Sequence, residues 1–94
     1  MQAQTATPIA PHVHWRVRHG ARLKFRYWDG ECVLYHGATG DTHRVPEPVG
    51  QVLEALTSSL SSIDDLSVTV DLHAADVAEI LDAMRELGIV ERVA

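Results

Sequence analysis

The spacing of apolar residues changes in the middle of the chain, at Pro46 and Pro48. Before these prolines, apolar and basic residues alternate with a period of two, most clearly over residues 23–28 and again over residues 14–18. This alternation is typical of half-buried β-strands. After the prolines, apolar residues recur every three or four positions, as they do on the buried stripe of an α-helix. Strands followed by helices predict an α+β fold of the winged-helix type.

Two groups of turn-forming residues divide the first half of the chain. Asp29 and Gly30 are typical of a tight hairpin turn, because both residue types tolerate the positive φ that such a turn requires. A second group, rich in glycine, turns the chain again at residues 37–41. We leave open whether residues 14–18 form an additional strand. The expected three-stranded antiparallel sheet is built from residues 23–28, 32–36 and 42–45.

Three helices are expected after the sheet. Pro48 suits the first turn of a helix, where its missing N–H has no role. Ser62, followed three residues later by Asp65, is typical of a capped helix start. Gly88 follows the clearest apolar stripe and marks a helix end. The predicted helices span residues 49–56, 62–70 and 74–87.

The length predicts one small domain. A chain of 94 residues can build one hydrophobic core but not a deep cleft between two lobes. We assign residues 14–94 to this domain and residues 1–13 to a flexible tail. Cys32 is the only cysteine, which excludes an internal disulfide and favours a reducing, cytoplasmic setting. The sequence predicts neither a membrane span nor a secretion signal.

Charge is divided unequally along the chain. Residues 1–46 hold six Lys and Arg against three Asp and Glu, whereas residues 47–94 hold two against ten. The first half therefore carries a charge of +3 and the second half −8, which together give the overall −5. Either the two halves attract each other or solvate separate faces, or the basic half binds a partner of acidic and apolar character.

The sequence does not predict a catalytic or metal site. Cys32 and His36 could pair as nucleophile and base, but four residues along one strand separate them by about 13 Å. His12 and His14 provide only two metal ligands, which is too few for a defined site. We therefore expect no enzyme activity, no cofactor and no metal.

A DNA-binding regulator is the main alternative, because residues 62–92 resemble the helix-turn-helix half of many winged-helix regulators. A recognition helix brings basic or amide side chains to phosphates and base edges. Residues 74–88 offer only Arg85 against four carboxylates. The charge of this half argues against nucleic acid as a partner.

Several segments carry a resemblance to a known family. They are residues 25–36, residues 42–45 leading into the helix at 49–56, and residues 76–90. With these segments, residues 23–93 resemble the PqqD family of peptide chaperones, also called RiPP precursor peptide recognition elements. More narrowly, the chain resembles the PqqD-type member of HPr-kinase-related (HPr-rel-A) systems. It departs from better-known members at residues 57–59, where Thr-Ser-Ser replaces their common Asp-Gly.

The resemblance implies a non-catalytic module for binding a precursor leader peptide. The peptide would add as a strand along residues 42–45, rest against the third helix, and be presented to a modifying enzyme or an HPr-kinase-related protein. A short strand at a sheet edge suits such pairing. Arg44 is the candidate partner for an acidic leader side chain, although it could equally be a solvated edge charge. The candidate peptide-binding residues are Thr42, His43, Arg44 and Val45 on the strand and Val77, Ile80, Leu81 and Met84 on the helix.

Two alternatives to this hypothesis are kept. The four apolar helix residues could be ordinary core, since a short helix has one apolar stripe and needs it for packing. The chain could also be a small structural or dimerisation domain whose exposed strand edges pair with each other.

Overall fold

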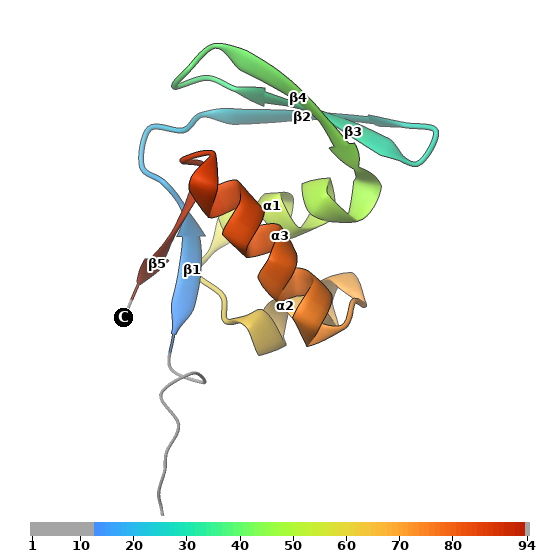
Figure 1. Ribbon diagram of the computed structural model, residues 1–94, viewed down its shortest axis with the longest axis vertical. Coiled ribbons are helices and arrows are strands. Elements are labelled where there is room, and N and C mark those ends of the chain that lie inside the picture. Colours follow the sequence, from blue (N-terminus) through green and yellow to red (C-terminus); the bar gives the residue numbers. More distant parts are fainter. Residues whose placement is uncertain (1–12, 94) are drawn as a thin grey trace, which may run out of the picture.

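The computed structural model describes residues 13–93 (Figure 1). All of the predicted tail except Val13 lies outside the described residues. The predicted α+β fold, with a three-stranded antiparallel sheet followed by three helices, is confirmed. In chain order the elements are β1 (His14–Val17), β2 (Leu23–Trp28), β3 (Glu31–His36), β4 (Asp41–Pro46), α1 (Glu47–Ser58), α2 (Ile63–Val70), α3 (Ala74–Glu86) and β5 (Val90–Val93).

The three-stranded sheet is a meander with the strand order β2-β3-β4. Asp29 (φ 53°) and Gly30 (φ 75°) both adopt positive φ in the β2–β3 turn, as the sequence predicts. Strand β3 pairs with both neighbours over its whole length. Strands β2 and β4 are therefore the two edges of the sheet, and in Figure 1 this sheet lies above the helices.

A second, two-stranded sheet joins the two ends of the described chain. Residues 14–17 do form a strand, and its antiparallel partner is β5. Arg16 stands opposite Glu91 in this pairing, and the Arg16 Nε donates a hydrogen bond of 2.7 Å to Glu91 Oε2. No strand was predicted after Gly88, because β5 is short and its partner lies at the other end of the chain.

The helices begin and end close to the predicted residues. Pro48 lies in the first turn of α1. The main-chain N–H of Asp65 donates a hydrogen bond of 3.1 Å to Ser62 Oγ, so the predicted cap of α2 is confirmed. Helix α3 ends before Gly88, whose positive φ of 78° turns the chain toward β5. None of the helices within residues 13–93 has the length and apolar character needed to cross a membrane.

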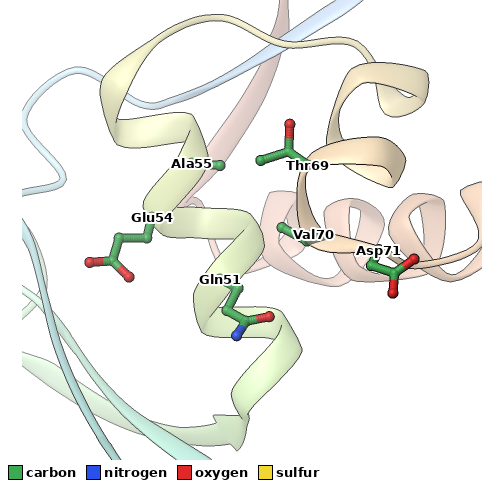
Figure 2. A pocket seen from close by; sticks show the side chains of 6 residues that line it. All are labelled: Gln51, Glu54, Ala55, Thr69, Val70 and Asp71. Atoms are coloured by element: carbon green, nitrogen blue, oxygen red, sulfur yellow. The ribbon is translucent and has the colours of Figure 1, made fainter.

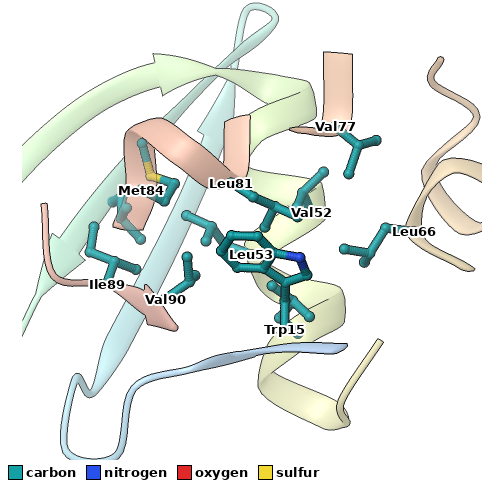
Figure 3. Close-up of a cluster of buried hydrophobic side chains, with 11 residues drawn as sticks. Trp15, Val52, Leu53, Leu66, Val77, Leu81, Met84, Ile89 and Val90 are labelled. Carbon is teal, nitrogen blue, oxygen red and sulfur yellow. The ribbon is translucent and has the colours of Figure 1, made fainter. Parts of the chain in front are cut away.

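The hydrophobic core lies between the helices and β1 (Figure 3). Trp15 of β1 is buried at its centre, and Leu34 of β3 connects it to the three-stranded sheet. Fully burying one such aliphatic side chain contributes roughly 1.5–3 kcal/mol. The buried cluster consists of Trp15, Leu34, Val52, Leu53, Leu56, Leu66, Val77, Leu81, Met84, Ile89 and Val90.

Helix α1 approaches the sheet closely at Gly50. A Cβ atom at this position would lie 2.7 Å from Cys32 Sγ and 2.9 Å from Tyr27 Cε1. Close to this contact, the Tyr27 hydroxyl of β2 donates a hydrogen bond of 2.6 Å to Glu54 Oε1 of α1. Helix α1 therefore covers one face of the sheet, which we call the inner face; the opposite, outer face carries Lys24, Arg26, Trp28, Glu31, Val33, Tyr35, Thr42, Arg44 and Pro46.

Candidate functional site

The main chain of β4 offers unpaired hydrogen-bonding groups at the sheet edge. Residues of an antiparallel strand alternately direct their N–H and C=O groups toward the partner strand and away from it. The N–H of Glu47 donates to the Gly30 carbonyl at 3.0 Å, one residue beyond the pairing of β3 with β4. Counting back from this bond, Asp41, His43 and Val45 bond to β3, whereas Thr42 and Arg44 direct their main-chain groups outward.

These outward groups have no other main-chain partner in the part of the chain that the structure describes. Outside the strand ladders and helices, no backbone hydrogen bond among residues 13–93 involves Thr42 or Arg44. Pro46, the next residue with this orientation, has no N–H to offer. The edge therefore presents two N–H donors and three carbonyl acceptors.

The side chains of β4 divide between the two faces of the sheet. Thr42 and Arg44 are exposed on the outer face, whereas His43 and Val45 are half-buried on the inner face. The Arg44 Nε lies 3.1 Å from Glu31 Oε1, and both side chains are at least half exposed. Such exposed ion pairs contribute about 0–1 kcal/mol, so a carboxylate from a ligand could replace Glu31 at little cost.

The predicted groove wall on α3 needs correction. Val77 and Leu81 are 0% exposed and Met84 is 6% exposed, and all three pack in the core shown in Figure 3. They are core residues, because α3 has a single apolar stripe and these residues of the stripe pack in the core. Only Ile80, at the margin of the stripe, is half-buried and accessible in part.

The outer face of the sheet combines cations with exposed aromatic rings, a feature that sequence reasoning missed. Trp28 is 46% exposed and Tyr35 is 38% exposed. The alternation of residues in β2 and β3 placed both on one face, but it could not show that no helix covers that face. Across the three strands the rows of this face are Lys24-Tyr35-Thr42, Arg26-Val33-Arg44 and Trp28-Glu31-Pro46.

An open cavity of about 520 Å³ lies between α1 and α2, where it is lined by side chains that include Gln51, Glu54 and Asp71 (Figure 2). The cavity contains two carboxylates but no histidine, cysteine or lysine that could act beside them. Glu54 is already an acceptor for Tyr27. The Thr69 hydroxyl also lines the cavity, but among residues 13–93 it has no hydrogen bond to either carboxylate, so no nucleophile is paired with a base there.

Cys32 is fully buried on the inner face of the sheet. Burial raises the pKa of the Cys32 thiol above its ordinary range, which keeps the thiol protonated and unreactive. Within residues 13–93, no group of three or more His, Cys, Asp or Glu side chains is arranged to hold a metal ion. His12, one of the two histidines considered for metal binding, lies outside the described residues.

The exposed side of α3 is acidic. Asp76, Glu79, Asp82 and Glu86 are all exposed, and Arg85 is the one exposed basic residue of this helix. A recognition helix with this charge would repel DNA phosphates. Comparison of the chain with protein-family models, with curated proteins and with solved structures finds no match.

Proposed function

We propose that this protein is a non-catalytic peptide-binding module. It captures an extended precursor peptide as a fourth strand on β4 and presents that peptide to a modifying enzyme. The observation that supports this proposal is the free edge of β4, where Thr42 and Arg44 direct unpaired main-chain groups outward. Such a binder belongs in the cytoplasm, where its lone cysteine stays reduced.

Main-chain pairing alone would give a weak complex. The N–H and C=O groups of Thr42 and Arg44 allow four hydrogen bonds, and each contributes about 1 kcal/mol net. A total of about 4 kcal/mol corresponds to a dissociation constant near 1 mM. Side chains must supply the rest of the affinity. Those beside an added strand are His43 and Val45 on the inner face and Thr42 and Arg44 on the outer face.

The outer face of the sheet provides a separate surface for the modifying enzyme. A peptide on the β4 edge leaves Trp28, Tyr35 and Arg26 uncovered. Three cations against Glu31 on this face fit an acidic enzyme surface with an apolar centre. Arg26→Glu should therefore reduce co-purification of the enzyme with the tagged chain while leaving peptide binding unchanged.

The peptide site is tested by selecting ligands from a displayed library of random short peptides on the immobilised full chain. A selected peptide is then titrated into the ¹⁵N-labelled protein. We expect the largest amide shifts at Thr42 and Arg44. Shifts confined to Leu23, Phe25 and Tyr27, whose main-chain groups face outward on β2, would assign the peptide to the other edge.

Arg44→Pro tests the contribution of the Arg44 main chain to peptide binding separately from that of its side chain. Proline removes an N–H that β3 does not use, so the sheet is expected to remain intact, as for other prolines on edge strands. Peptide affinity should fall at least about tenfold, as expected for a lost donor and a blocked edge. Arg44→Ala, the matched control, keeps the N–H and should bind more tightly than Arg44→Pro.

Equal peptide affinity of wild type and Arg44→Pro would refute strand addition on β4. If Arg44→Pro does not fold, Thr42→Pro offers the same test, because the Thr42 N–H also faces outward. A DNA duplex titrated at low salt is the control for the regulator alternative, and we expect no binding.

A further inference from the structure

A second cavity lies where three segments meet below one end of the sheet. Its volume is about 240 Å³, and it lies between the β1–β2 connection, the β3–β4 turn and the end of α3. Figure 1 shows the C-terminal end of α3 beside the chain that links β1 to β2. The cavity holds more than one water, at about 30 Å³ each, but is smaller than the roughly 300–1,000 Å³ of pockets for drug-sized ligands. It suits a small chemical group.

His36 forms part of the cavity wall and is only 3% exposed. Its main-chain carbonyl accepts hydrogen bonds from the β3–β4 turn, but its ring makes no hydrogen bond or ion pair with any of residues 13–93. Asp41 stands opposite His36 in the strand register and does not pair with it. Most buried polar side chains in proteins have a partner. The His36 ring is therefore an unused hydrogen-bonding group at a cavity.

The cavity rim carries further side chains that, like the His36 ring, can donate hydrogen bonds. Arg18 and His19 are exposed at its rim, and no carboxylate among residues 13–93 lines it. The Thr39 hydroxyl is already used, because it donates to the His36 carbonyl and accepts from the Asp41 N–H. Arginine presents a planar set of donors that fits the oxygens of a carboxylate or phosphate. Histidine supplies a further ring N–H. These residue types together favour an oxyanion.

Main-chain hydrogen bonds hold the walls of the cavity in place. The N–H of Arg18 donates to the Ile89 carbonyl at 2.8 Å, and the N–H of Ala38 donates to the Ala21 carbonyl at 3.1 Å. A Cβ atom on Gly37 would lie 2.7 Å from the Arg22 carbonyl, so the β3–β4 turn lies directly against this connection. Arg18 and His19 are thus carried by a fixed loop, and ligand binding requires little ordering of the main chain.

We propose that this cavity binds a small oxyanion, a carboxylate or a phosphate, with Arg18, His19 and His36 as the binding side chains. The inference does not depend on the peptide-binding function. Two sources share this chemistry: an acidic group of a bound peptide and a free phosphate.

The test titrates the full ¹⁵N-labelled chain with sodium phosphate, sodium acetate and N-acetyl-aspartate amide, at an ionic strength kept constant with sodium chloride. We expect saturable shifts of the His36 ring nitrogens and of the amides of Ala38, Thr39 and Gly88. Preference for acetate and the aspartate derivative would identify a carboxylate site. Preference for phosphate would identify a phosphate site.

Arg18→Ala should weaken the tightest of these anions about tenfold, as expected for the loss of a charge-assisted hydrogen bond. His19→Ala should weaken it less. Arg92→Ala is the matched control, because Arg92 is an exposed arginine of β5 that does not line the cavity, and binding should not change. Shifts that do not saturate, or equal affinity of wild type and Arg18→Ala, would overturn the proposal. Arg18 and His19 are both exposed, so the Arg18→Ala and His19→Ala variants are expected to fold.

Discussion

Replacement of Gly50 by alanine tests how closely α1 packs against the sheet. On helix propensity alone, Gly50→Ala should stabilise the protein by about 1 kcal/mol. The structure predicts the opposite, because the new Cβ would lie 2.7 Å from Cys32 Sγ, 2.9 Å from Cys32 Cβ and 2.9 Å from Tyr27 Cε1. Cys32 is fully buried and Tyr27 is hydrogen-bonded to Glu54, so neither can move away freely. Overpacking of this kind costs about 1–3 kcal/mol.

Because the clash must also cancel the propensity gain, we expect Gly50→Ala to lower the free energy of unfolding by about 1 kcal/mol net. For a domain of this size that corresponds to a decrease in Tm of about 4–8 °C. Urea unfolding followed by tryptophan fluorescence measures the change, with the buried Trp15 as a reporter.

Two further variants test whether the clash of the new Cβ causes the loss of stability in Gly50→Ala. Val68→Ala, at a position of α2 that is 83% exposed, raises helix propensity without a new contact and should not destabilise the protein. Cys32→Ala removes the Sγ contact, so the cost of Gly50→Ala should be smaller in that background. A Gly50→Ala protein as stable as wild type would refute the packing argument.

Two further predictions concern single hydrogen bonds. Tyr27→Phe removes the bond to Glu54 and should cost about 1 kcal/mol in urea unfolding. Burial and the hydrogen bond to Glu54 raise the pKa of Tyr27 above its ordinary value of about 10. The associated stability is fully present below that value and is lost as pH rises toward the folded-state pKa, so wild type should lose more stability than Tyr27→Phe on alkaline titration. Ser62→Ala removes the cap bond to the Asp65 N–H and should lower Tm, for a cost of about 0.5–2 kcal/mol, whereas Ser62→Asp should retain most of the stability.

Local sequence patterns predicted the elements that are determined by residues close together in the chain. The period-two alternation, the Asp29 and Gly30 turn and the Ser62 cap depend on residues that are near each other in the chain. Strand β5 was missed because its partner is β1, more than seventy residues away in the Arg16–Glu91 pair. No local pattern records such a pairing.

The candidate site was also predicted only in part, because local patterns do not show what a surface faces. Periodicity correctly placed Val77 and Leu81 on an apolar stripe of α3, but a stripe does not tell whether it faces a ligand or the core. The edge position of β4 was expected from its length and turns, and the strand order confirms it. The burial of the His36 ring without a partner was not predicted, because it depends on the placement of three other segments, which the sequence does not specify.

The three proposed binding surfaces use different atoms of one small domain. Peptide capture uses main-chain groups at the β4 edge, enzyme docking uses side chains on the outer face, and the anion cavity lies at the end of α3 below the sheet. Arg44→Pro, Arg26→Glu and Arg18→Ala should therefore each impair one kind of binding and leave the other two. If Arg18→Ala also weakened a selected acidic peptide, but not its amide counterpart, the cavity would be the anchor for an acidic group of that peptide. The two sites would then act as one.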